Sequence, residues 1–123
     1  MALTVEVAEN RPGIYSITPL GSIDTNTHTV LEATVDSVLS ASPKVVILDM
    51  EGVTYISSMG LRVIFKLSKA LGQSGGKLTM GNLQPQIRKV FEIINVLPSM
   101  NIFESVVELD NYLDAMQRKE IGF

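Results

Sequence analysis

The sequence predicts an α/β fold, and three observations support that prediction. First, residues 2–20 alternate apolar and polar side chains on both sides of an Arg11-Pro12-Gly13 turn, which is typical of a β-hairpin. Second, apolar stripes at helical spacing then alternate with short strand-like segments, the pattern of a mostly parallel sheet. Third, no linker, repeat or low-complexity tract divides the 123 residues, a length that supports one hydrophobic core. We therefore expect a single domain over residues 1–123.

The first half of the chain predicts two strands, a helix and a central strand. After the hairpin, residues 21–27 form a polar loop in which Thr25, Asn26 and Thr27 are candidate helix N-caps. An apolar stripe predicts the helix that follows, ending near residues 40–41 before Pro43. The unbroken run from Val45 to Leu48 is rich in β-branched residues and predicts a central strand buried on both faces.

The second half continues the alternation. Residues 52–56 are expected to be a connection, and a helix begins near Ser57 or Ser58 and ends in the glycine-rich turn at residues 72–76. Residues 77–80 predict a strand, and Pro85 is suited to the first position of another helix, closed by Pro98. A short strand near residues 101–103 and a last amphipathic helix complete the chain. The predicted order is ββαβαβαβα, a mixed, mostly parallel sheet of about five strands covered by about four helices.

Composition excludes several classes of function. The formal net charge is -3 and the pI about 5.0, which argues against a nucleic acid or an anionic membrane as the main partner. The chain has no cysteine and one histidine, so we expect no disulfide, no catalytic thiolate and no metal site. No cofactor-binding motif stands in the required context. The absence of a signal-like or membrane-spanning segment predicts a cytoplasmic protein.

The segment from Ser57 to Leu61 is the most informative one for function. On the helix that it opens, Ser58, Arg62 and Lys66 gather on the solvent side, and Met59 lies at the border with the core side. A serine before a helix commonly caps it, because its oxygen accepts a bond from a free backbone N–H. The same position suits a phosphate, since free N–H groups and the helix dipole stabilise negative charge. The two roles do not exclude each other.

Three sequence segments resemble the STAS domain, the sulfate-transporter and anti-sigma-factor-antagonist family. They are Gly21-Ser22-Ile23-Asp24 after the second strand, Val45 to Asp49 as the third strand, and Ser57-Ser58-Met59-Gly60-Leu61 at the second helix. The single domain is similar to the bacterial anti-sigma factor antagonists in particular. In that family an anti-sigma factor that is itself a serine kinase phosphorylates the serine two residues before the helix glycine. The resemblance therefore implies that Ser58 is the phosphorylated residue.

The resemblance also implies partners and a binding surface. The resemblance implies a partner-switching module with no enzymatic activity. In its unphosphorylated form it would bind a kinase-type anti-sigma factor, and a PP2C-type phosphatase would restore that form after phosphorylation. The common form of the motif is Asp-Ser-Ser-Gly, so Ser57 replaces the Asp and Met59 the second Ser, which makes Ser57 the second choice for the phosphate. The expected partner-binding residues are Asp24, Thr25, Asn26, Ser57, Met59, Gly60 and Arg62. An equally strong interpretation of Asp24 is that it orders a turn or caps the first helix.

Other functions stay open to different degrees. A STAS-like domain can instead be a non-phosphorylated subunit of a stress-signalling or lipid-transport complex, with Ser58 unmodified. A phospho-aspartate receiver with Asp49 as acceptor is disfavoured, because residues 1–20 contain only Glu6 and Glu9 as acidic residues and begin with a hairpin. A small enzyme is disfavoured because the single histidine provides no convincing catalytic triad. The protein is expected to be a monomer or a weak dimer.

Overall fold

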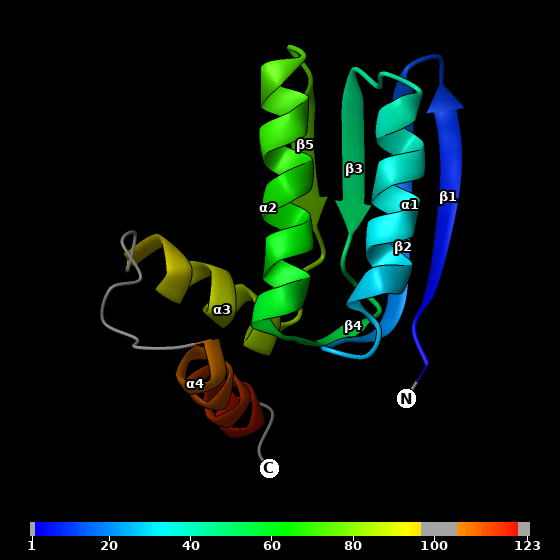
Figure 1. The fold of residues 1–123 in the computed structure, drawn as a ribbon. Helices are drawn as coiled ribbons and strands as arrows, with labels where there is room; N and C mark the ends of the chain where they lie inside the picture. The colour runs from blue at the N-terminus through cyan, green and yellow to red at the C-terminus, as the bar shows by residue number, and fades with distance from the viewer. Residues whose placement is uncertain (1, 97–105, 121–123) are drawn as a thin grey trace.

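The computed structural model describes residues 2–96 and 106–120. This part of the chain forms five strands and four helices, whose arrangement Figure 1 shows. In chain order they are β1 (Thr4–Arg11), β2 (Ile14–Ile23), α1 (His28–Ser40), β3 (Val45–Asp49), β4 (Val53–Ile56), α2 (Ser58–Gln73), β5 (Lys77–Gly81), α3 (Pro85–Val96) and α4 (Val106–Glu120). The predicted α/β class is confirmed. The strand predicted near residues 101–103 lies outside the described residues.

The sheet is mixed and mostly parallel, as the sequence predicts. β1 and β2 form the antiparallel hairpin, with Val7 opposite Ile17. β3 lies parallel to β2 and β5 parallel to β3, which gives the strand order β1-β2-β3-β5. Gly13 turns the hairpin with a φ of 82°, a conformation that glycine adopts without steric cost. The carboxyl ends of β3 and β5 point to the same side of the molecule, where α2 begins (Figure 1).

Two boundaries differ from the prediction. β2 continues through Ile23, so residues 21–23 belong to a strand and not to a polar loop. Residues 53–56 form the strand β4 and not a plain connection. The two differences have one cause: Gly21 pairs with Val53 and Ile23 with Ile56, in parallel, so each segment is extended because the other lies beside it. Pairing between residues about 30 positions apart leaves little trace in local sequence pattern.

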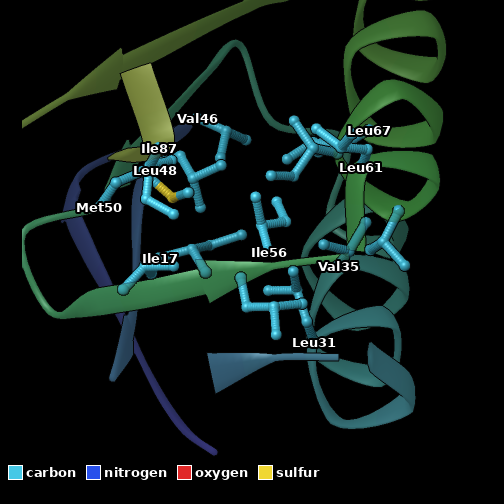
Figure 2. Close-up of a cluster of buried hydrophobic side chains, with 14 of the residues drawn as sticks. Ile17, Leu31, Val35, Val46, Leu48, Met50, Ile56, Leu61, Leu67 and Ile87 are labelled. Carbon is cyan, nitrogen blue, oxygen red and sulfur yellow. The ribbon is translucent and has the colours of Figure 1, made fainter. Parts of the chain in front are cut away.

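α1 and α2 lie side by side over one face of the sheet (Figure 1). Their buried residues meet those of the strands in the core that Figure 2 shows, where Leu31 and Val35 of α1 lie near Ile56 and where Leu67 of α2 is fully buried. β3 is completely buried only on alternate residues, Val46 and Leu48. The prediction that β3 is buried on both faces is therefore only partly correct. One face is fully buried, and Val45 and Ile47 on the other face are half-buried.

The helices otherwise follow the sequence pattern closely. α1 ends at Ser40 and α3 begins at Pro85, both as predicted. On α2, Val63 is buried and Ser68 is exposed, whereas a strict helical wheel places Ser68 on the core side. No helix in the described part of the chain combines the length and apolar character that crossing a bilayer requires.

Candidate functional site

The N-terminus of α2 is fixed by Ser57. This residue has extended backbone (φ -91°, ψ 174°), and its Oγ accepts a hydrogen bond from the Gly60 N–H at 3.3 Å. Ser57 is 3% exposed. The predicted capping role is therefore confirmed for Ser57. Its hydroxyl is therefore buried and already serves the helix end.

The start of α2 rests directly against the end of β2. The Ser57 N–H donates to the Ile23 carbonyl oxygen at 2.8 Å. Gly60 makes the contact close: a Cβ at that position would lie 2.6 Å from Ile23 Cγ2 and 2.8 Å from Ile56 Cγ1. Asp24 follows Ile23 in the chain and Ser58 follows Ser57. The structure thus brings the loop at residues 24–26 and the start of α2 together, two segments that are more than 30 residues apart in the sequence.

Ser58 is the first residue of α2, but it is less accessible than its place on the helix predicts. Its side chain is half-buried and its Oγ is shielded from solvent. The expectation of an exposed Ser58 is therefore wrong. Side chains on a helix lean toward its N-terminus, so Ser58 leans back toward the segment that leads into α2 and not outward from the helix face. A phosphate on this oxygen cannot remain shielded, because burying an unpaired dianion is too costly, and the side chain must turn outward.

Asp24 organises the neighbouring loop. Its Oδ1 accepts hydrogen bonds from the N–H groups of Asn26 at 2.9 Å and Thr27 at 3.0 Å. The buried Thr27 hydroxyl also contacts this oxygen at 3.1 Å and donates to the Ser22 carbonyl at 2.6 Å. Asp24 therefore holds a turn at the start of α1, while Thr25 and Asn26 remain exposed beside it. The predicted turn-forming role of Asp24 is confirmed, and its role toward a partner remains a prediction.

These hydrogen bonds stabilise the ionised form of the Asp24 carboxylate. Partial burial by itself would raise the pKa of Asp24, but the bonds from Asn26, Thr27 and Ser22 outweigh it and lower that pKa below its ordinary value of 3.8. A carboxylate with a lowered pKa stabilises the folded state above its unfolded pKa. That contribution is lost as the pH falls through the folded pKa.

We therefore expect Asp24→Asn to lower the free energy of unfolding by about 1 kcal/mol at pH 7, because the charged acceptor is lost. The difference from the parent should shrink as the pH falls below 3.8 and the parent carboxylate takes up its proton. Urea unfolding at pH 7 and near pH 3 measures both values. Glu92→Gln, at an exposed position of α3, is the control and should change stability by less than about 0.5 kcal/mol. A difference for Asp24→Asn that is equal at both pH values would contradict this assignment.

The outer face of α2 carries few free positive charges near Ser58. Arg62 is exposed and Met59 is half-buried, as predicted. Lys66, however, reaches across to α1 and pairs with Asp36 at 2.9 Å and Glu32 at 3.2 Å. The hydrogen bond from Lys66 to Asp36, and to a smaller extent the one to Glu32, raises the pKa of Lys66 above its ordinary value of 10.5. Lys66 thus ties α1 to α2 and is not available to Ser58, which leaves Arg62 as the nearer basic side chain on that helix. Phe65 is 44% exposed on the same face.

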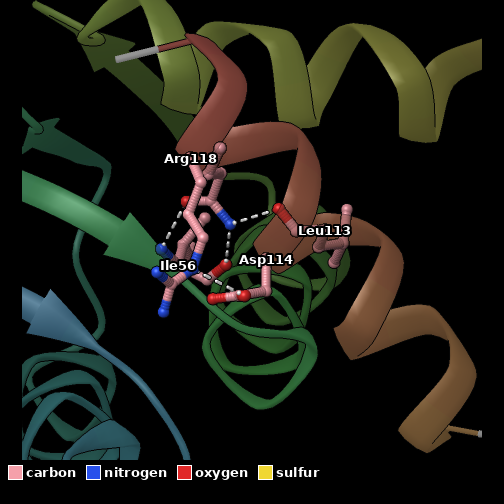
Figure 3. A network of polar contacts seen from close by, with 5 residues as sticks. Ile56, Leu113, Asp114 and Arg118 are labelled. Atoms are coloured by element: carbon pink, nitrogen blue, oxygen red, sulfur yellow. Dashed lines mark hydrogen bonds and ion pairs between the residues drawn. The ribbon is translucent and has the colours of Figure 1, made fainter. Parts of the chain in front are cut away.

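Sequence reasoning missed a set of amide side chains that form hydrogen bonds with the segment before Ser58. Gln117 of α4 is 1% exposed, and its amide pairs with the backbone of Ile56 (Figure 3). Gln84 and Gln86 donate to the carbonyl oxygens of Glu51 and Thr54. Asn82 donates to the side-chain carboxylate of Asp49. One signal was present in the sequence: Gln117 follows Leu113 by four residues and so lies on the apolar face of its helix.

The described residues contain no group of three or more histidine, aspartate or glutamate side chains that could hold a metal ion. Asp49, the residue considered as a phospho-acceptor, accepts bonds from the Glu51 N–H and the Asn82 amide, both at 3.1 Å. The site therefore consists of a capped helix start, a partly shielded serine and an ordered acidic loop. Such an arrangement can present a hydroxyl and a surface to a partner.

Comparison with known proteins places these features in context. The STAS domain family matches residues 7–109. BtrV of Bordetella bronchiseptica, which is named as an anti-sigma factor antagonist, is 37% identical over 78 residues, 61% of this chain and 67% of BtrV. The anti-sigma-F factor antagonist RsfB of Mycobacterium tuberculosis is 30% identical over 73 residues, 59% of each chain, so the match spans less than two thirds of RsfB.

The fold has close counterparts among solved structures. The phosphorylated form of the Bacillus cell fate determinant SpoIIAA superposes with a TM-score of 0.64 at 18% identity, over 77% of this chain and 86% of SpoIIAA. At this level of identity the likeness concerns the fold alone.

Proposed function

The chain belongs to the STAS domain family, and from that premise we propose that it is an anti-sigma factor antagonist. In its unmodified form it binds an anti-sigma factor that is also a serine kinase, and so frees the sigma factor. Phosphorylation of Ser58 ends that binding, and a PP2C-type phosphatase restores it. The protein acts as a binding module and supplies no catalysis.

The observation that carries this proposal is the position of Ser58. It is the first residue of α2, it follows a helix cap formed by a different serine, and it lies at the junction with the Asp24 loop. The names of BtrV and RsfB support the same function. SpoIIAA, which shares the fold, is itself known in a phosphorylated form.

The physical basis of release is charge and desolvation. A phosphoserine adds a charge of roughly -1.5 to -2 at neutral pH. At the N-terminus of α2 the free N–H groups stabilise that charge, so modification is compatible with the fold. In a docked complex the same charge must lose its water, and an interface that has no cation to pair with it is strongly destabilised. Lys66 is engaged by Asp36 and Glu32, so the nearer basic side chain that α2 offers to the phosphate is Arg62.

The surface around Ser58 is proposed as the partner-binding site. It comprises Asp24, Thr25, Asn26, Ser57, Met59, Gly60 and Arg62. Thr25, Asn26 and Arg62 are exposed and can contact a partner directly. Ser57 and Gly60 are buried, so their contribution is to hold the helix start in place.

The proposal is tested by mapping phosphorylation on the protein isolated from its own cells. We expect intact mass spectrometry to find a species heavier by one phosphate, and peptide sequencing to locate that phosphate on Ser58. The same chain carrying Ser58→Ala, expressed in those cells, is the control and should lack the heavier species. A phosphate on Ser57 would keep the mechanism but place the phosphorylation site on Ser57. Its absence under every growth condition would favour the alternative, a non-phosphorylated subunit of a stress-signalling or lipid-transport complex.

A further inference from the structure

The C-terminal helix α4 is joined to the end of β4 by one buried side chain, Gln117. Its Oε1 accepts from the Ile56 N–H at 2.9 Å, and its Nε2 donates to the Ile56 carbonyl oxygen at 2.8 Å. A second bond from Nε2 to the Leu113 carbonyl oxygen, at 3.1 Å, fixes the amide on its own helix. Figure 3 draws these bonds as dashed lines that reach Ile56 and Leu113, with α4 lying over the end of β4. Both amide N–H groups and the amide oxygen of Gln117 therefore have partners within the protein.

The pair of bonds to Ile56 has the form of strand pairing. A neighbouring strand residue would also exchange one N–H and one C=O with Ile56. The strand pairing described for β4 is with β2, along residues 21–23, so Gln117 completes the opposite edge. A buried backbone group that loses its partner is costly, so α4 cannot leave this position without exposing or orphaning the Ile56 backbone.

Ile56 stands two residues before Ser58, and the intervening residue is also fixed. The Ser57 N–H is held by the Ile23 carbonyl and the Ser57 hydroxyl by Gly60. The backbone that leads into α2 is thus held by β2 on one side and by α4 on the other. In this arrangement the Ser58 Oγ is shielded. A kinase requires that oxygen to be accessible, so only the fraction of molecules in which the segment opens can react.

We propose that Gln117 is a positioning residue for Ser58, which couples the docking of α4 to phosphorylation. While α4 is docked, the segment holds Ser58 in its shielded position. Release of α4 from Ile56 raises the accessible fraction and speeds phosphorylation. By linkage, the phosphate that turns Ser58 outward weakens the docking of α4 to the same degree. This inference rests on the proposed function for its biological meaning, but the coupling itself can be measured without a partner.

The test uses Gln117→Met, which keeps the length and packing of the side chain but removes both bonds to Ile56. We expect amide hydrogen exchange by NMR to be at least tenfold faster at Ile56 and measurably faster at Ser57. The amides that join β2 and β3 should keep the parent rate, which shows that the chain is still folded. If Gln117→Met does not fold, Gln117→Asn retains the amide on a shorter side chain and gives the same comparison.

Gln86→Met is the matched control. Gln86 is also buried, and its Nε2 donates to the Thr54 carbonyl at 3.0 Å, farther from Ser58 along the chain. The Gln86→Met variant should leave the amide hydrogen exchange rate at Ser57 unchanged. In cells, the Gln117→Met protein should show at least a threefold higher fraction phosphorylated on Ser58 than the parent.

The outcomes separate the two proposals. If the parent is never phosphorylated, the proposed function fails whatever the exchange rates are. If the parent is phosphorylated and Gln117→Met speeds exchange at Ile56 without changing the phosphorylated fraction, the coupling is overturned. Unchanged exchange at both Ile56 and Ser57 overturns it as well.

Discussion

Under the proposed function, replacing Ser58 by aspartate should abolish tight binding to the serine-kinase anti-sigma factor proposed as partner. We expect the Kd to rise at least about 100-fold, which corresponds to about 2.7 kcal/mol of binding free energy. The reason is that a carboxylate at the start of α2 must lose its hydration when the partner docks, and charges left unpaired in an interface cost several kcal/mol. Ser58→Ala should bind at least as tightly as the parent, and ATP should no longer release it. Isothermal titration with and without ATP measures both effects.

Ser68 offers a matched control for this experiment. It is a serine on the same helix, it is exposed, and it lies ten residues beyond Ser58. Ser68→Asp adds the same charge to the same helix and should change the Kd by less than about threefold, because exposed charges away from the contact are well screened. Equal affinities of Ser58→Ala and Ser58→Asp would remove phosphorylation from the mechanism. The site would then be a constant docking surface.

Gly60→Ala should destabilise the fold by about 2 kcal/mol, because overfilling a packed core typically costs about 1–3 kcal/mol. The added methyl group would meet Ile23 Cγ2 at 2.6 Å and Ile56 Cγ1 at 2.8 Å, with the Ile23 carbonyl oxygen at 3.2 Å. Both isoleucines are fully buried and stiff at χ1, so α2 itself must move away from β2. Urea unfolding followed by circular dichroism measures the loss as a lower midpoint at unchanged slope.

Gly72→Ala is the control for Gly60→Ala. Gly72 lies near the end of the same helix, and a Cβ there meets nothing within 4 Å. Alanine has the higher helix propensity, so we expect this change to stabilise the protein by about 0.5–1 kcal/mol. Opposite signs for the two substitutions would establish that Gly60 is required for the close contact of α2 with β2. A Gly60→Ala protein as stable as the parent would mean that this contact tolerates a wider spacing than the structure has.

The elements that local sequence pattern predicts well are those whose signals are contained within one segment. The hairpin of β1 and β2 follows from alternation around Gly13, and α3 begins at Pro85, where a missing N–H carries no penalty. The cap of α2 belongs to the same group, because Ser57 and Gly60 lie within a single turn. In the same way, the family motif located the candidate site at Ser58.

The features that sequence reasoning missed all depend on residues far apart in the chain. β4 is a strand because β2 extends beside it, and the true accessibility of Ser58 follows from how the start of α2 packs on that pair. Gln117 is separated from Ile56 by 61 residues. A buried glutamine on an apolar stripe signals that a polar partner exists, but it does not identify that partner.

The sequence by itself therefore determined the α/β class, the order of most elements and the position of the helix start that carries Ser58. Periodicity, turn residues and caps act over a few residues, so they can be seen in the chain without its fold. Only the tertiary structure decided which side chains surround that serine, how far its hydroxyl is shielded and that α4 is joined to β4. These depend on backbone and side-chain groups that must find partners when they are buried, and the partner can come from any part of the chain that the fold brings near.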